Sequence, residues 1–378
     1  MTLHTIRRKR KGNILVLTAC MMVVMVGMLA CAIDLGYLYV AREEMQRSAD
    51  STALAGAWEL IDESTLTGSG DVYIVETNAR AFAAQYAGLN KVLNAAPALA
   101  QDDVIIGFMD DPTDASSSIS QTTGNASNAV WVRVRRTASQ NGEVPFFLAK
   151  ILGIDRAATE VDAIAAVRSN FQGFQTPSAG SLDILPFALD ENTWNDLLIG
   201  NATDNWTWDS VDQEVESGSD GILEVNLYPQ STGSPGNRGT VDIGSSNNST
   251  ADIARQIVDG VSVNDLSYHG GKLEFDEWGE LGLNGDTGIS AGVKDELESI
   301  KGLPRIIPIF RDVTGLGNNA MYTIVRFAGV RIMEVKLTGN PSSKRVIVQP
   351  ASVVARGGIP TTASSTTDFV YSPAWLVR

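Results

Sequence analysis

The sequence predicts an α+β fold in which one long helix leaves a membrane and carries a strand-rich body. Three observations support this class. Residues 14–33 carry no charge, residues 34–93 show two alanine-rich helical patterns, and the remainder consists mostly of short β-prone runs separated by turns. With 378 residues, 44% of them apolar, the chain is long enough to build a packed core.

The uncharged run from Ile14 to Ile33 is the first element of this fold. A helix of about 20 residues spans about 30 Å, the thickness of the hydrocarbon core of a bilayer. Cations cluster between Arg7 and Lys11, and none follows the run until Arg42. Because cationic residues stay on the cytoplasmic side, we expect a cytoplasmic tail at 1–12. A single-pass inner-membrane anchor follows at 13–33, with a periplasmic or extracellular body.

A signal peptide is the competing interpretation, because it too has a basic start before an apolar run. Ala30-Cys31-Ala32 fits a small-residue cleavage signal. Cleavage there would release the body as a secreted binding module. The run is longer than the 7–15 residues usual for a signal peptide, which favours a retained anchor.

Both cysteines of the chain lie inside this span. At 100° per residue, Cys20, Gly27 and Cys31 share one helix face and could form a small-residue seam against another membrane helix. The alternative is that small residues fall there by chance. With the anchor retained, the exported body has no disulfide, so its stability depends on a hydrophobic core.

The helical pattern continues beyond the span, and no proline occurs before Pro97, so we expect the membrane helix to extend outward without a break. Ala49, Ala53 and Ala57 make this extension thin and permit close approach of another element. We expect them to contact a partner protein. The alternative is that they pack only on the chain's own second helix, predicted at Val72–Leu93.

Beyond the helices we expect mainly strands, with short helices at Phe146–Leu152 and, after a cap at Ser249-Thr250, at Ala251–Asp259. A Gly- and Ser-rich stretch at 169–181 predicts the border between an extracytoplasmic region at 34–168 and a strand-rich lobe at 169–378. The turn at Gly339-Asn340-Pro341 predicts an antiparallel meander around it. The expected strands are Val104–Met109, Val130–Arg136, Thr159–Val167, Ile222–Leu227, Arg305–Phe310, Tyr322–Val330, Arg331–Leu337 and Arg345–Val354. For Thr159–Val167 a helix is the alternative, and the flanking Val161, Ile164 and Val167 favour the strand.

Signatures of catalysis are poor. The chain has no Walker loop, no C-x-x-C and no G-x-S-x-G motif, and it has only two histidines. The acidic pairs Asp276-Glu277 and Asp295-Glu296 leave a membrane-anchored envelope hydrolase as the alternative function, because two carboxylates facing across a cleft can hydrolyse glycosides. Solvated charges are the expected interpretation, so we predict no catalytic residue and no cofactor.

Two further short motifs have the residues of known functional sites but not their sequence context. Asp114-x-Ser116-x-Ser118 has the spacing of a metal site but follows turn residues, so we expect a solvated loop and no metal. Asn284–Gly288 contains Asp-Thr-Gly, for which we expect a glycine turn. The formal net charge of −15 argues against nucleic acid as a partner, since phosphate binding needs a basic patch.

The stretch Lys11–Leu60 resembles the N-terminus of TadG-like and related Tad (Flp) pilus-assembly proteins. The shared parts are the basic start, the apolar span closed by Ala-Ile-Asp-Leu-Gly, and the following alanine-rich helix. A weaker similarity continues at Val144–Val167. Leu17 stands where a type IV prepilin has glutamate, so a major pilin is not expected. The resemblance implies a non-catalytic envelope protein that helps assemble or export adhesive pili, with other Tad proteins or pilins as partners.

The anchor interpretation predicts that the protein stays in the inner-membrane fraction through an alkaline carbonate wash. Its C-terminus should become accessible to protease only after the outer envelope is opened. A mature N-terminus at Ile33, found by mass spectrometry, would contradict the anchor and support cleavage.

Overall fold

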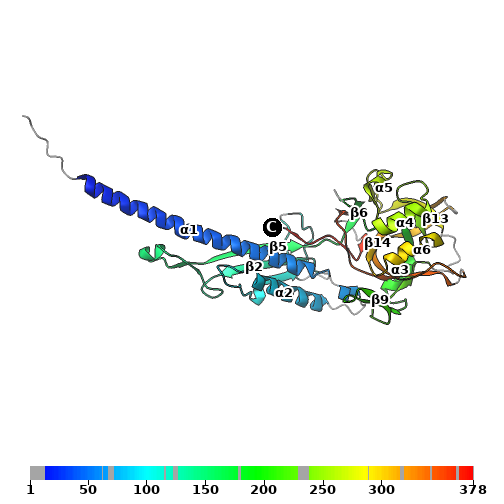
Figure 1. Ribbon diagram of the computed structural model, residues 1–378, viewed down its shortest axis with the longest axis horizontal. Coiled ribbons are helices and arrows are strands. Elements are labelled where there is room, and N and C mark those ends of the chain that lie inside the picture. The colour runs from blue at the N-terminus through cyan, green and yellow to red at the C-terminus, as the bar shows by residue number, and fades with distance from the viewer. Residues whose placement is uncertain are drawn as a thin grey trace, which may run out of the picture. The chain divides into compact units, whose positions relative to one another are not determined.

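The structure of the protein is a computed structural model. It describes residues 13–61, 63–66, 72–114, 116–121, 127–177, 180–228, 238–287, 289–315, 319–340, 343–362 and 366–377. The predicted cytoplasmic tail at 1–12 lies outside these residues. The predicted α+β class is confirmed, because a long apolar helix precedes further helices and many antiparallel strands (Figure 1).

Helix α1, Asn13–Trp58, is one continuous helix of 46 residues (Figure 1). It combines the predicted span and its outward extension, as expected from the absence of proline. The second helix is confirmed as α2, Val72–Leu89, which ends earlier than predicted. Leu93 and Asn94 follow with positive φ angles of 49° and 67°, a left-handed backbone that cannot continue an α-helix.

A four-stranded sheet follows the helices in the order β1-β2-β5-β21. The strands predicted from Val104, Val130 and Thr159 are confirmed as its first three members. The last strand comes from the C-terminus, where Trp375 pairs antiparallel with Ala166. The bounds are β1 Val104–Gly107, β2 Ala129–Arg136, β5 Thr159–Ala166 and β21 Trp375–Leu376.

A hairpin lies between β2 and β5. Strands β3, Val144–Pro145, and β4, Arg156–Ala157, pair antiparallel at its base. Between them lies the 3₁₀ helix η3, Ala149–Leu152, where the sequence predicts helix. Two other short 3₁₀ helices are η1, Glu63–Leu66, and η2, Gln101–Asp103.

The C-terminal lobe is built on an eight-stranded sheet whose path runs β10-β16-β15-β13-β11-β7-β14, with β19 beside β15. Strand β14 pairs with β15 as well as with β7, so five of these strands close into a ring. Closure leaves these strands without a free edge. The bounds are β7 Phe187–Asp190, β10 Val225–Asn226, β11 Arg238–Val241, β13 Leu281–Thr287, β14 Pro304–Thr314, β15 Ala320–Lys336, β16 Arg345–Pro350 and β19 Thr367–Asp368.

The sequence predicts an antiparallel meander from the runs 322–330, 331–337 and 345–354. The pairing of the last run is confirmed, because β15 and β16 pair antiparallel, but the prediction of two strands at 322–330 and 331–337 is wrong. Strand β15 is a single element of 17 residues. Gly329 does not mark a turn. A Cβ there would lie 2.4 Å from the carbonyl oxygen of Ala351, so glycine lets a neighbouring backbone pass close to the strand.

Smaller elements complete the lobe. The helix predicted after Ser249 is confirmed as α4, Thr250–Asp259, whereas three other short helices are additions to the predicted strands. These are α3 Glu191–Leu198, α5 Val263–Ser267 and α6 Lys294–Ser299, with η4 Ala291–Val293. The remaining strands are β6 Phe171–Gln175, β8 Trp206–Asp209, β9 Glu214–Ser217, β12 Lys272–Glu274, β17 Val353–Val354, β18 Gly358–Pro360 and β20 Val370–Tyr371.

Two hydrophobic clusters stabilise the lobe. One is centred on residues such as Trp194 and Ile307, the other on residues such as Phe174 and Phe327, and all four side chains are buried. The indole N–H of Trp194 donates to Asp368 at 2.8 Å, so this buried polar atom is satisfied. These clusters provide the core that a chain without disulfides needs.

The chain folds into two compact units. The first consists of Met1–Ala53, Ala83–Ile105 and Trp131–Ala163, and the second of Leu54–Phe82, Ile106–Val130 and Ile164–Arg378. The predicted border at 169–181 stays a prediction.

Replacing Gly239 by alanine is expected to destabilise the C-terminal lobe. A Cβ at Gly239 would lie 1.9 Å from the hydroxyl oxygen of Tyr322 and 2.3 Å from the carbonyl oxygen of Asp286. Overpacking of this kind costs about 1–3 kcal/mol, which a thermal melt followed by near-UV circular dichroism would detect. Gly282→Ala is the matched control, because its nearest neighbour is the Met321 sulfur at 3.7 Å. Equal melting temperatures for the two variants would contradict the close approach at Gly239.

Candidate functional site

The apolar half of α1 is covered by no other described part of the chain. Leu15, Met25 and Leu29 are 78%, 66% and 61% exposed, values that a soluble core helix does not show. Among the described helices, α1 is the one long and apolar enough to cross a membrane. Single-pass anchoring is therefore indicated by length and composition.

The predicted seam lies on this exposed part of the helix. Cys20 and Cys31 are exposed free cysteines, and a Cβ placed at Gly27 would meet no heavy atom within 4 Å. No described residue of the chain thus occupies this face. Packing of Cys20, Gly27 and Cys31 against another membrane helix stays a prediction.

The residue that ends the uncharged run makes the most informative contact of the N-terminal unit. Asp34 is only 3% exposed, although it directly follows exposed Ile33. Its carboxylate accepts hydrogen bonds from the backbone N–H groups of Phe147 at 2.7 Å, Leu148 at 3.1 Å and Ala149 at 2.6 Å. These donors begin η3, whose N-cap residue Leu148 offers no side-chain acceptor. Asp34 therefore caps η3 from a different helix.

Three further contacts fasten the same hairpin and its neighbours to α1. The ring of Tyr37 meets the ring of Phe147 edge-on at 5.0 Å. The Glu44 carboxylate accepts the backbone N–H of Leu93 at 2.7 Å, and the Gln46 amide donates to the carbonyl oxygen of Asp162 at 3.2 Å. Within the first unit, α1 thus serves as the support on which loops and strands are held.

The alanines expected to contact a partner are buried inside the chain itself. Ala49, Ala53 and Ala57 are 0% exposed, and Ala41 and Met45 extend this face toward the span. The close approach that small side chains permit is therefore used within this chain. A contact of these alanines with another protein stays a prediction.

The acidic pairs are used in local structure. The Asp276 carboxylate accepts the backbone N–H groups of Trp278 and Glu280 and so closes its own turn. Asp295 is 95% exposed in the first turn of α6, next to Lys294. These contacts match solvated turn and helix charges for Asp276 and Asp295, whereas Glu296 is half-buried and one of its carboxylate oxygens has no partner among the described residues.

Like Asp242, Glu224 combines deep burial with a raised pKa, which are features of a catalytic acid. It is 1% exposed, and burial raises its pKa, with the nearby charges of Asp204 and Asp220 adding to this effect. Its oxygens, however, accept the backbone N–H groups of Asn205 and Trp206. A cavity of about 370 Å³ adjoins this segment, but the residues that line it carry no charged or polar side chain. The lining includes Leu197, Leu198, Ile199, Leu223 and Phe369.

The two motifs with familiar spacing also have structural roles. Asp114 is exposed, and its carboxylate accepts the backbone N–H and the hydroxyl of Ser116 at 2.8 Å, as expected for a Ser-rich loop. The glycine turn predicted at Asn284–Gly288 is wrong, because residues up to Thr287 belong to strand β13. Gly285 explains the difference. A Cβ there would lie 2.2 Å from the carbonyl oxygen of Thr240, so the glycine lets β11 approach.

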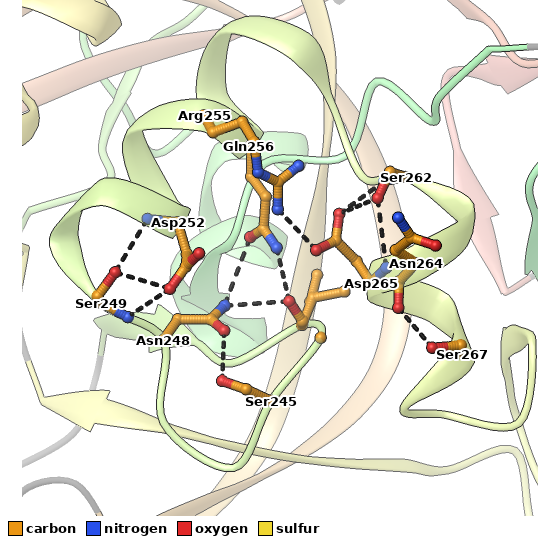
Figure 2. A network of polar contacts seen from close by, with 12 residues as sticks. Ser245, Asn248, Ser249, Asp252, Arg255, Gln256, Ser262, Asn264, Asp265 and Ser267 are labelled. Carbon is orange, nitrogen blue, oxygen red and sulfur yellow. Dashed lines mark hydrogen bonds and ion pairs between the residues drawn. The ribbon is translucent and has the colours of Figure 1, made fainter.

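The densest cluster of polar side chains lies around α4 and α5, and Figure 2 shows how its members bind one another. Ser249 and Ser262 each begin a helix with a reciprocal serine–aspartate capping box. Arg255 donates to Asp265 at 2.6 Å, and buried Gln256 donates to the carbonyl oxygen of Ile243 (Figure 2). These groups connect the two helices, so the cluster is structural.

His269 is also committed to the backbone. Its Nε2 accepts the N–H of Gly244 at 3.3 Å, and burial lowers its pKa, which favours the neutral ring at neutral pH. A neutral, hydrogen-bonded imidazole in this position holds a loop. Among the residues that the structure describes, no group of three or more His, Cys, Asp or Glu side chains could hold a metal ion.

Local sequence patterns did not single out Asp34 or its hairpin as a site. The available signal was an acid placed directly after an uncharged run, a costly position unless a partner satisfies the charge. The partner backbone lies 113 residues further along the chain, so no local pattern could reveal it.

Removing the Asp34 carboxylate is expected to release the hairpin. In Asp34→Ala, the N–H groups of Phe147, Leu148 and Ala149 lose their acceptor, so their amide hydrogens should exchange faster with solvent. Glu43→Ala is the control, because Glu43 is an exposed acid on the same helix. Unchanged exchange at all three amides in Asp34→Ala, measured by mass spectrometry on detergent-solubilised full-length protein, would contradict the capping role.

The N-terminal part of the chain matches two models of known protein families. Residues 12–59 match the family model described as Flp pilus-assembly TadE/G-like, and residues 55–165 match the one described as Tad-like Flp pilus-assembly. No curated protein and no solved structure matches the chain. The two matched stretches contain α1 and the hairpin that Asp34 caps. The resemblance noted in the sequence is confirmed, and the chain is similar over residues 12–165 to Tad-type Flp pilus-assembly proteins.

Proposed function

We propose that this protein is a non-catalytic, membrane-anchored component of the assembly or export of Tad (Flp) adhesive pili. One observation carries the proposal. The Flp pilus-assembly match at residues 12–59 coincides with α1, the described helix that is long and apolar enough to cross a membrane. Anchorage and family similarity thus reside in the same element.

The proposed topology places the N-terminus in the cytoplasm and the body in the periplasm or outside the cell. The cations from Arg7 to Lys11 precede the uncharged run, and Asp34 and Glu43 follow it. Cationic residues remain on the cytoplasmic side, which supports this direction. The inner membrane is the location that agrees with such a span.

Helix α1 supplies a support that is continuous across the membrane boundary. At about 1.5 Å per residue, its 46 residues measure about 70 Å, roughly twice the thickness of a hydrocarbon core. Asp34, Glu44 and Gln46 attach loops and a strand to the part outside the span. We infer that the helix positions the N-terminal unit at a set height above the bilayer.

Other Tad assembly proteins or pilins are the proposed partners, and the span seam is the more accessible of the two predicted contacts. Cys20, Gly27 and Cys31 face no described residue, whereas Ala53 is covered by the chain itself. Small residues on an exposed face let a second membrane helix approach closely. We therefore place the first partner contact on the seam, with the buried alanines available only to a partner that displaces the chain's own contacts.

The alternative of an anchored envelope hydrolase gains no support from the described residues. Asp276 closes a turn, Asp295 is solvated, and buried Glu224 binds backbone N–H groups beside a cavity lined by residues without polar side chains. The secreted binding module remains distinguishable by the mature N-terminus. A structural role agrees with the internal use of these carboxylates.

Deletion of the gene is expected to abolish surface pili, as seen by electron microscopy, and expression of the wild-type chain should restore them. Normal pili in the deletion strain would contradict the proposed function.

Gly27→Leu should reduce co-purification with other Tad components, because a large side chain blocks close helix approach. Thr18→Leu is the matched control, since residue 18 lies on the opposite helix face. Both variants must reach the membrane at normal levels.

A further inference from the structure

We propose that the hairpin loop 146–155 is a second membrane contact, which inserts the side chains of Phe147, Ile151 and Ile154 into the lipid interface beside α1. The bilayer that surrounds the span is the proposed occupant. The inference rests on the membrane anchorage in the proposed function, and it adds a lipid-binding site that lies far from the span in the sequence.

The position of the loop is set by where the span ends. Asp34 is the first charged residue after Ile14–Ile33, and its carboxylate binds the backbone at Phe147, Leu148 and Ala149. The loop therefore starts at the level where α1 leaves the hydrocarbon. In Figure 1 it is the green turn that lies alongside the apolar half of α1.

Aromatic side chains mark the same level. The Tyr37 ring lies one helical turn beyond Asp34 and meets Phe147 at 5.0 Å, and Tyr39 close by is 66% exposed. Tyrosine rings concentrate at the boundary between hydrocarbon and water, where one end is apolar and the other is wet. This places the contact between α1 and the loop at the membrane interface.

The exposed surface of the loop is apolar. Phe147, Ile151 and Ile154 are 57%, 83% and 53% exposed, while neighbouring Phe146 is buried. Three large apolar side chains on one short loop form a surface that water solvates poorly. The loop is held to Asp34, at the end of a helical span whose own apolar residues require lipid.

The backbone of the loop suits an apolar environment. Polar groups that enter lipid must be satisfied within the protein. Three backbone N–H groups donate to backbone carbonyl oxygens at 2.9–3.1 Å: Phe146 to Asp155, Ile151 to Leu148, and Ile154 to Ala149. Three more N–H groups are bound by the Asp34 carboxylate. Most amide donors of the loop are thus bound internally and need no water.

Charged groups limit how deep the loop can go. Lys150 is exposed on η3, and Asp155 and Arg156 are exposed at the base of the hairpin. A lysine can extend its ammonium to the headgroup level while its alkyl chain lies among apolar groups. The loop therefore enters the interface and stops short of the bilayer centre.

A depth measurement on the full-length chain tests the proposal. In a Cys20→Ala, Cys31→Ala background, Ile151→Cys is labelled with the environment-sensitive fluorophore NBD. The protein is reconstituted as one chain per nanodisc, with phosphatidylcholine and phosphatidylglycerol carrying shallow doxyl quenchers. Val211→Cys is the matched control, because Val211 is 87% exposed in the β8–β9 hairpin. We expect blue-shifted emission and at least three-fold stronger quenching at residue 151.

The outcomes separate lipid from other coverings. Emission at 151 equal to that at 211 would place the loop in water and overturn the proposal. A blue shift without doxyl quenching would mean that protein covers the loop, which also overturns it. Adding Asp34→Ala should reduce the quenching at 151, since the tether to α1 is lost. The readout uses purified protein and lipid, so its failure leaves the pilus proposal to the deletion experiment.

Discussion

The hydrogen bonds between the Asp34 carboxylate and the start of η3 determine how the N-terminal unit is built. A carboxylate that is 3% exposed at the edge of an apolar span needs donors, and the first N–H groups of a helix need acceptors. Each side therefore satisfies the other, with donor–acceptor distances down to 2.6 Å. Charge-assisted bonds of this kind are stronger and more directional than neutral ones. The hairpin is consequently held to α1 at one defined residue.

The C-terminal lobe obtains its stability differently. Five of its strands close into a ring, two hydrophobic clusters of buried side chains form the core, and glycines at 239, 285 and 329 permit close passage of neighbouring backbone. Closure removes free strand edges, which would otherwise pair with other chains.

The acidic character of the chain has a structural explanation in many places. Asp190, Asp252 and Asp265 cap helices, Asp209 and Asp276 close turns, and Glu224 binds two backbone N–H groups. Carboxylates at helix starts and turns accept N–H groups that would otherwise lack partners. Part of the excess of acids in this protein therefore stabilises its short helices and turns.

Local patterns in the sequence were sufficient for the span, the continuous helix α1, the strands β1, β2 and β5, and the cap at Ser249, because each depends on neighbours within a few residues. They failed for β15 and for Asn284–Gly288, where glycines serve strands that come close from elsewhere in the chain. Residues distant in the sequence likewise decide that Ala53 is buried by its own chain and that Asp34 has hydrogen-bond partners. The physical reason is that periodicity records which face of an element is apolar, whereas tertiary structure decides what covers that face.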